Sequence, residues 1–151
     1  MVRLSLEELY KEVILDHYRS PRNKGRIDPH DVALERNNPL CGDEIELFLR
    51  FDGDRLDGIA FEGKGCSISQ ASTSMMTEKV QGLSAVQAGD VAEAIKRMLA
   101  GEDHGDADSL GDLVSLKGVV KYPVRIKCAL LGWNTLLEGL EESGRAASET
   151  P

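Results

Sequence analysis

The stretch Asn37-Asn38-Pro39-Leu40-Cys41-Gly42-Asp43 places a thiol and a carboxylate two residues apart, with a glycine between them. Glycine tolerates tight and left-handed backbone conformations, so the sulfur of Cys41 and an oxygen of Asp43 can reach a common point. The chain has two further cysteines, Cys66 and Cys128. Three thiols and one carboxylate supply the four donors of a tetrahedral zinc site. We therefore expect the fold to bring all four side chains together.

The residues after this stretch predict a β-hairpin. Positions 44–51 alternate between apolar and charged side chains, which is the period of a strand with one buried and one wet face. Asp52-Gly53-Asp54 is a hairpin signal, and a partner strand is expected at 55–62, with a bulge at Asp57-Gly58. The two open ends of a hairpin are neighbours. Because Cys41 precedes the first strand and Cys66 follows the second, the hairpin predicts a shared site.

The remaining elements complete an α+β fold. Apolar residues at helical spacing predict helices at 5–19, 67–80 and 84–99, a short helical turn at 110–116 and a last helix that begins near Pro123. A short strand is expected at 32–36. Together these elements predict an antiparallel three-stranded sheet covered on one face by helices. We expect a single domain over 1–151, with a flexible tail from about residue 143.

The composition narrows the class of protein. The chain has 151 residues, 41% of them hydrophobic and 29% charged, and a formal net charge of −8. An acidic chain does not suit nucleic acid as its main partner, because a phosphate backbone requires a clustered positive surface. No apolar run approaches the roughly 20 residues of a membrane helix. Without a signal-peptide pattern, we expect a reducing cytoplasm, where cysteines are more often metal-binding or reactive than bridged.

Spacing alone does not decide between a metal site and three unrelated buried cysteines, because no Cys-x-x-Cys pair is present. The Cys-Gly-Asp stretch and the hairpin favour the metal site. Four anionic donors around Zn²⁺ leave two negative charges, and Arg125 or Lys127, close to Cys128, would offset about one of them. These two cations also have a simpler explanation as exposed residues at the start of a helix.

Three other patterns favour a structural role over a functional one. His17 lies in the apolar stripe of the first predicted helix, where we expect a hydrogen-bonded, half-buried histidine rather than a metal ligand. The small polar run at 67–74 predicts close helix packing with hydroxyls bonded locally, rather than contact with a ligand. The acidic loop at 101–108 lacks the ligand spacing of a calcium loop and is expected to be solvated.

With these residues in view, the chain resembles the IscU/NifU-like family of iron–sulfur cluster assembly proteins, and within it the SufU branch. The resemblance covers nearly the whole chain and rests on Ile14-Leu15-Asp16-His17-Tyr18, Pro21-Arg22-Asn23, Asn38-Pro39-Leu40-Cys41-Gly42-Asp43, Gly65-Cys66-Ser67-Ile68-Ser69 and Arg125-Ile126-Lys127-Cys128. IscU-type proteins carry a histidine immediately before the third cysteine, where this chain has Lys127. The stretch around 101–118 is similar to an extra segment of SufU-type proteins.

The resemblance implies a zinc-dependent sulfurtransferase whose partner is a pyridoxal-phosphate cysteine desulfurase of the SufS type. It implies that Cys41 accepts the sulfur, that Arg125 stabilises the Cys41 thiolate, and that the persulfide passes to downstream iron–sulfur scaffold proteins. Zinc would be held at rest by Cys41, Asp43, Cys66 and Cys128.

Two alternatives remain open at this point. In the first, the chain is a scaffold on which an iron–sulfur cluster is assembled with the same ligands. Lys127 disfavours it, because one ligand of the family is then missing. In the second, the zinc is purely structural. Asp43 disfavours that alternative, since structural zinc sites are built mostly from cysteine and histidine.

Overall fold

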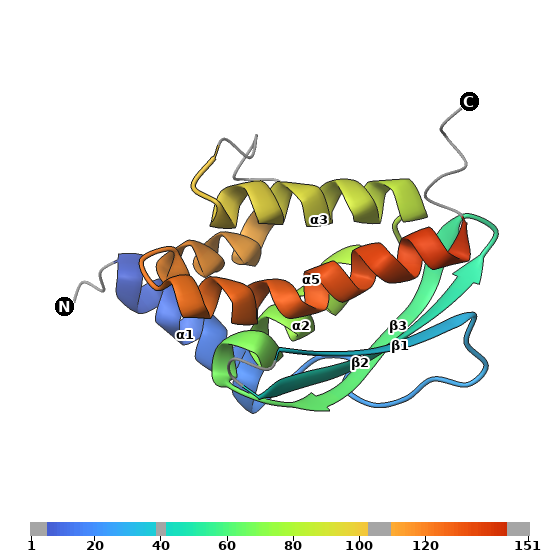
Figure 1. The fold of residues 1–151 in the computed structure, drawn as a ribbon, viewed down its shortest axis with the longest axis horizontal. Helices are drawn as coiled ribbons and strands as arrows, with labels where there is room; N and C mark the ends of the chain where they lie inside the picture. The colour runs from blue at the N-terminus through green and yellow to red at the C-terminus, as the bar shows by residue number, and fades with distance from the viewer. Residues whose placement is uncertain (1–5, 39–41, 103–109, 145–151) are drawn as a thin grey trace.

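The chain folds into a three-stranded sheet beneath two layers of helices (Figure 1). The computed structural model describes residues 6–38, 42–102 and 110–144. In chain order the elements are α1 (Leu6–Arg19), β1 (Val32–Asn38), β2 (Asp43–Asp52), β3 (Arg55–Lys64), α2 (Ser67–Val80), α3 (Ala85–Leu99), the 3₁₀ helix η1 (Gly111–Val119) and α5 (Pro123–Ser143). The predicted α+β class and the element order are confirmed. The predicted tail lies mostly outside the described residues.

The sheet is an antiparallel meander in the order β1-β2-β3. A register shift opposite Arg50 and Phe51 leaves Asp57 as an extra residue, which confirms the predicted bulge. β1 runs two residues further than predicted, because Asn37 and Asn38 still pair with the start of β2. Glu44 pairs with Lys64 at the open end of the β2–β3 hairpin, so the residues that flank these strands lie side by side.

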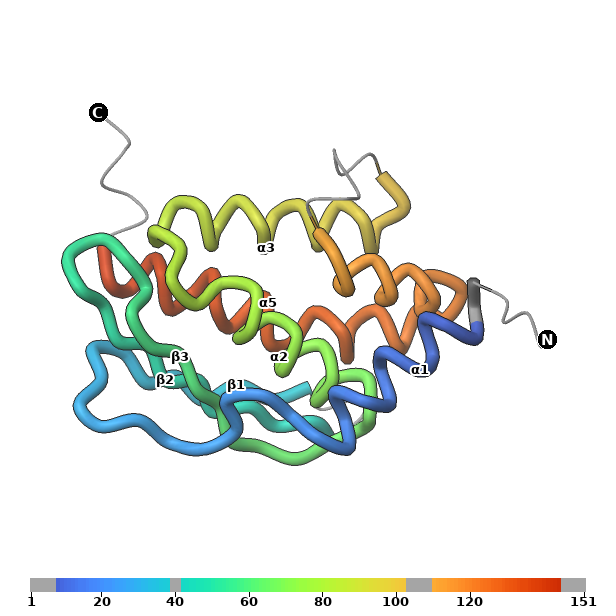
Figure 2. The backbone as a smooth tube through the Cα atoms, turned by 180° about the vertical axis from the view of Figure 1, so that it is seen from behind, coloured from blue at the N-terminus to red at the C-terminus, as the bar shows by residue number. Residues whose placement is uncertain are grey.

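The helices are stacked over one face of the sheet, with α5 at the centre. It contacts β1, β2, α2, α3 and η1, and α3 lies above it as the outer layer (Figure 1). Two glycines let α5 approach its neighbours closely. A Cβ at Gly139 would meet the Leu49 side chain on the sheet at 2.8 Å, and one at Gly132 would overlap the Thr73 side chain on α2. The view from behind shows α1 beside η1 (Figure 2), and α1 also packs on α2.

The other face of the sheet is only partly exposed to solvent. This corrects the expectation that β2 has one buried and one solvent-exposed face. Phe48 points away from the helices by strand alternation, yet its exposure is 0%. The chain between α1 and β1 crosses this face, with the His30 ring 5.3 Å from the Phe48 ring and the Arg26 guanidinium 5.0 Å from it. The alternation of charged residues around Phe48 concealed this second, smaller apolar contact.

The small polar run of α2 packs as predicted against neighbouring helices, but its hydroxyls also bond beyond their own helix. Ser72 donates a hydrogen bond to the carbonyl of Ala129 on α5 (2.7 Å) and accepts one from the Trp133 indole (3.0 Å). All three side chains are buried. These bonds fix α2 against α5, the two helices that begin beside the predicted metal ligands.

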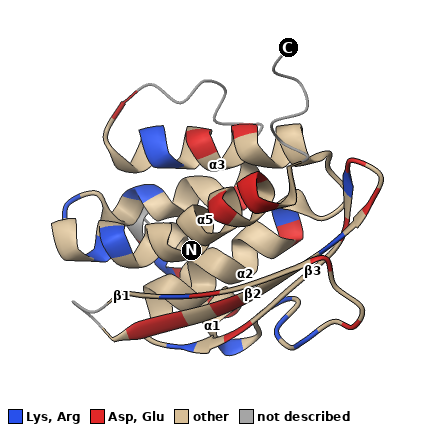
Figure 3. Cartoon of the chain, turned by 45° about the vertical axis from the view of Figure 1, so that its right-hand side comes forward, with Lys and Arg blue, Asp and Glu red and all other residues tan. Residues whose placement is uncertain are grey.

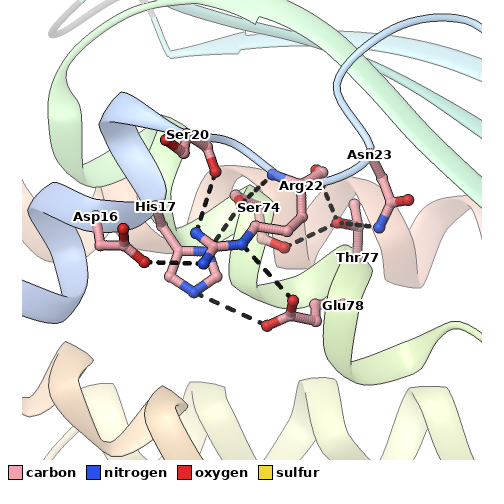
Figure 4. A network of polar contacts seen from close by, with 8 residues as sticks. All are labelled: Asp16, His17, Ser20, Arg22, Asn23, Ser74, Thr77 and Glu78. Carbon is pink, nitrogen blue, oxygen red and sulfur yellow. Dashed lines mark hydrogen bonds and ion pairs between the residues drawn. The ribbon is translucent and has the colours of Figure 1, made fainter.

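A second polar network ties α1 to α2 (Figure 4). Nδ1 of His17 lies 2.8 Å from Ser74 Oγ, and the backbone N–H of Arg22 donates to the same oxygen over 2.8 Å. The Arg22 guanidinium pairs with Asp16 at 2.8 Å and with Glu78 at 3.7 Å. His17 is 2% exposed, so it is the hydrogen-bonded core residue that the sequence favoured, and more deeply buried than expected.

The environment of this network shifts the pKa values of its members. Burial lowers the pKa of His17 below its ordinary value of 6.5, and the positive charge of Arg22 acts in the same direction. The hydrogen bond from Arg22 lowers the pKa of Asp16. His17 is therefore held neutral in the folded chain at a pH where an exposed histidine is already protonated.

We predict that His17 weakens the fold at acid pH. As the pH falls below 6.5, His17 binds a proton in the unfolded chain but stays neutral in the folded chain. The free energy of unfolding therefore decreases. The slope from this one group is at most about 1.4 kcal/mol per pH unit. Urea unfolding between about pH 5 and about pH 7.5 measures it. His17→Asn keeps a hydrogen-bonding side chain without this titration and should show a shallower slope. Parallel slopes for the two proteins would contradict the prediction.

Candidate metal centre

Three of the four predicted ligands meet in the structure. The ligand atoms of Asp43, Cys66 and Cys128 all lie within 4.8 Å of one another. They come from three different elements: Asp43 begins β2, Cys66 stands immediately before α2, and Cys128 lies in the second turn of α5. The hairpin places Asp43 beside Cys66, and the packing of α5 on α2 adds Cys128. The predicted meeting of Cys41 with Cys66 across the same hairpin stays a prediction.

The Asp43 carboxylate is the most enclosed polar group of the site, with an exposure of 0%. Its Oδ1 accepts a hydrogen bond from the backbone N–H of Cys66 over 2.7 Å, and its Oδ2 lies 3.6 Å from the Cys66 sulfur. Cys66 is the N-cap residue of α2, so Asp43 supplies a carboxylate oxygen to the positive end of that helix. The carboxylate thus orders the loop that carries the thiol.

Gly65 makes this arrangement sterically feasible. Its φ is +153°, a conformation that residues with a side chain rarely adopt, and a Cβ at this position would overlap Oδ1 of Asp43. The sequence indicated only a flexible loop at Gly63-Lys64-Gly65. In the structure, the absence of a side chain at Gly65 lets the Asp43 carboxylate reach the backbone of Cys66.

Cys128 supplies the deepest thiol. Its exposure is 0%, whereas Cys66 is partly exposed. The Cys128 sulfur lies 3.4 Å from the carbonyl oxygen of Val124, one turn earlier in α5. Pro123 occupies the first turn of α5, as the sequence predicted, and so fixes where the helix starts relative to Cys128. The site is therefore closed on the side of the helices and more open towards Cys66.

Cys41 lies outside the described residues, so its predicted place in the site stays a prediction. The described residues nearest to Cys41 in the sequence are Asn38 and Gly42. Gly42 has a φ of +69°, and its N–H donates to the carbonyl of Asn38 over 2.9 Å. Asn38 pairs with Asp43 across β1 and β2. Gly42 has the positive φ that glycine tolerates, and the meeting of the Cys41 sulfur with the Asp43 carboxylate stays a prediction.

The other residues singled out in the sequence lie around the site or away from it. Arg125 is exposed in the first turn of α5 and lines a groove with Ser67, the residue after Cys66. Lys127 is also exposed. His17 bonds to Ser74 and is absent from the described metal-ligand cluster. Most of the acidic loop, 103–109, lies outside the described residues.

The donor set suits a borderline-soft divalent cation. Two thiols and a buried carboxylate match the ligands of zinc or of iron in an iron–sulfur site, and hard cations such as magnesium prefer oxygen alone. Three protein donors also leave room for a fourth ligand. An oxygen of the buried Asp43 carboxylate lies 3.6 Å from the Cys66 sulfur, so the two groups can share one metal ion. The described residues therefore fit a bound metal ion.

Known proteins are similar to this chain in sequence and in fold. The chain is 44% identical to the zinc-dependent sulfurtransferase SufU of Bacillus subtilis, over 93% of this chain and 96% of that protein. It is 42% identical to the iron–sulfur cluster assembly scaffold protein IscU of Streptococcus pyogenes, over 97% of this chain and 91% of that protein. The crystal structure of FiSufU from Fervidobacterium islandicum AW-1 superposes with a TM-score of 0.83 at 36% identity, over 90% of this chain and 99% of that one.

A model of a protein family also matches this chain. The model of the NifU-like N-terminal domain matches residues 9–129, a span that includes Cys41, Asp43, Cys66 and Cys128. The resemblance inferred from the sequence motifs is therefore confirmed. Together with the shared fold, this match shows that the chain belongs to the family of NifU-like N-terminal domains, which includes the SufU and IscU proteins.

Proposed function

We propose that this chain is a zinc-dependent sulfurtransferase of iron–sulfur cluster assembly, which accepts sulfur on Cys41 from a SufS-type cysteine desulfurase. The observation that carries the proposal is the convergence of Asp43, Cys66 and Cys128 within 4.8 Å. The identity of 44% to a relative named as a zinc-dependent sulfurtransferase supports the choice of metal and reaction.

Asp43, Cys66 and Cys128 would hold the zinc, and Cys41 would complete the set of four donors at rest. When bound, zinc supplies the positive charge that keeps coordinating thiols deprotonated at neutral pH. The protein residues do the rest. Asp43 orients the loop of Cys66 through the hydrogen bond to its N–H, and the closed side formed by α5 limits the access of water to Cys128.

Sulfur transfer needs a thiolate and a persulfide. The Cys41 thiolate would attack the outer sulfur of a cysteine persulfide on the desulfurase. A new S–S bond forms at Cys41, the S–S bond of the donor breaks, and the donor cysteine leaves as a thiolate, so no external oxidant or reductant is required. Arg125 would lower the energy of the Cys41 thiolate through its positive charge. The product is a persulfide on Cys41.

The partners and compartment follow from this chemistry. The Cys41 persulfide would be passed to a downstream iron–sulfur scaffold protein, and the pyridoxal phosphate of the reaction would belong to the desulfurase. A reducing compartment such as the cytoplasm suits the three thiols. Among the helices that the structure describes, none combines the length and apolar character needed to cross a membrane.

A second candidate function is that of a scaffold for iron–sulfur cluster assembly. The specific observation in its favour is the identity of 42% to a relative named as a scaffold protein, over nearly the full length of both chains. The same cysteines and Asp43 would then ligate iron. Lys127 disfavours this candidate, because it stands where IscU-type proteins carry a histidine.

We predict that Gly65→Ala empties the metal site. The new Cβ would overlap the Asp43 carboxylate, break its hydrogen bond to Cys66 and separate two ligands. Zinc per chain, measured by elemental analysis, should fall from about one to well below half.

Gly25→Ala is the matched control. Gly25 has a similar φ of +140°, but no atom lies within 4 Å of a Cβ built there. It should keep its zinc and lose about 1 to 3 kcal/mol of stability to backbone strain. Equal zinc in both variants would contradict the prediction.

We predict that Cys41→Ser abolishes sulfur transfer and preserves the fold. The desulfurase rate with this variant should equal the rate of the desulfurase alone, because serine cannot form a persulfide. Alanine formation from cysteine measures the rate. In the unsubstituted chain, mass spectrometry after the reaction should find one extra sulfur atom on the peptide that contains Cys41. Full stimulation by Cys41→Ser, or the extra sulfur on Cys66 or Cys128 alone, would rule out Cys41 as acceptor.

A further inference from the structure

A groove of about 350 Å³ opens beside the metal centre, where α1, the first turn of α2, η1 and the first turn of α5 meet. Its lining includes Tyr10, Lys11, Ser67, Ile68, Tyr122 and Arg125. Ser67 directly follows the ligand Cys66, and Arg125 lies three residues before the ligand Cys128. Anything held in this groove is therefore next to two of the metal ligands.

The groove exposes a large aromatic side chain, because Tyr122, which lines it, is 54% exposed. Tyr122 is one of the four large hydrophobic side chains that are exposed in the described part of the chain. Tyrosine and arginine are also the residue types that contribute most often to binding energy at protein interfaces. The groove thus has the composition of a protein-docking surface rather than of a solvated crevice.

The described residues that line the groove include two cations, Lys11 and Arg125, and no carboxylate, and the exposed Glu8 and Glu12 lie close to Lys11 in the sequence of α1. No aspartate or glutamate occurs from Leu113 to Leu137, whereas this stretch carries Lys117, Lys121, Arg125 and Lys127. The formal net charge of the whole chain is −8. Figure 3 shows blue segments near the start of α5, besides others such as the one on α3, and red segments on β2 and on the later turns of α5. The first turn of α5 lacks an acidic residue, so the positive end of its helix dipole adds to these charges.

We propose that this groove is the docking surface for the sulfur donor, and that it takes a segment of that protein in which carboxylates flank an apolar side chain. The apolar side chain packs between Tyr10 and Tyr122, and the carboxylates face Lys11 and Arg125. The inference rests on the proposed function, because it takes the donor to be the SufS-type cysteine desulfurase. A partner seated here covers the open side of the metal centre, beside Cys66.

Substitutions on two sides of the groove test the proposal in the zinc-loaded chain. Lys11→Glu reverses a charge, and Tyr122→Ser removes an exposed aromatic ring; neither residue has a role in the transfer step. The desulfurase rate is measured against the concentration of this chain. In the double variant the half-saturating concentration should rise about tenfold or more, whereas the rate at saturation returns to the unsubstituted value. Added salt should raise the half-saturating concentration of the unsubstituted chain more than that of the Lys11→Glu variant. Salt screens the attraction between Lys11 and the partner's carboxylates, and the variant lacks this attraction.

Arg97→Glu is the matched control, because it makes the same charge reversal at an exposed position of α3, a helix that contributes no residue to the groove. Its half-saturating concentration should stay within about twofold of the unsubstituted value. Zinc content is measured for every variant, and it should not change. If Arg97→Glu weakens stimulation as much as Lys11→Glu, the effect reports net charge and the groove is overturned as the docking surface.

The remaining outcomes separate this proposal from the function on which it rests. A double variant with an unchanged half-saturating concentration overturns the groove and leaves the sulfurtransferase function intact. A dimeric chain that Tyr122→Ser converts to a monomer assigns the groove to a second copy, which also overturns the proposal. If the unsubstituted chain binds the desulfurase in calorimetry without stimulating it, the proposed function fails, and the dissociation constants of the same variants then test the groove by themselves.

Discussion

The buried carboxylate of Asp43 is the constraint on which the rest of the site depends. A fully enclosed negative charge is costly unless it is hydrogen-bonded and close to a positive charge. The N–H of Cys66 meets the first need over 2.7 Å and lies at the positive end of α2. A metal ion bound between Asp43, Cys66 and Cys128 would supply that positive charge. The same residue therefore shapes the loop and offers an oxygen to a cation.

The larger fold supports this constraint through backbone geometry. The register of β2 and β3 places the start of one strand beside the end of the other, so Asp43 and Cys66 need only the short Gly65 loop between them. The close contact of Gly132 with Thr73, and the bond of Ser72 to Ala129, hold α2 against α5 about one to three turns after the two helices begin. Cys128 is thereby delivered to a site that is distant from it in the sequence.

Local patterns in the sequence predict most of this structure. Strand alternation, the Asp-Gly turn and helical spacing indicate each element, and the hairpin indicates that its two open ends, one of which carries Cys66, lie side by side. Two features depend on contacts between distant segments and leave no local pattern. Phe48 is buried by the chain around His30, which crosses the far face of the sheet. Gly65 reads as a flexible loop residue, and only the position of Asp43 explains why a side chain is excluded there.

The most direct test of the metal centre is the metal content of the purified chain, measured together with its visible absorption spectrum. About one zinc per chain and no visible colour are expected, because Zn²⁺ has a filled d shell and binds to this set of thiolates and carboxylate. Iron with inorganic sulfide and a brown colour would contradict the sulfurtransferase function and favour the scaffold. A folded chain without any metal would contradict the four-ligand site itself.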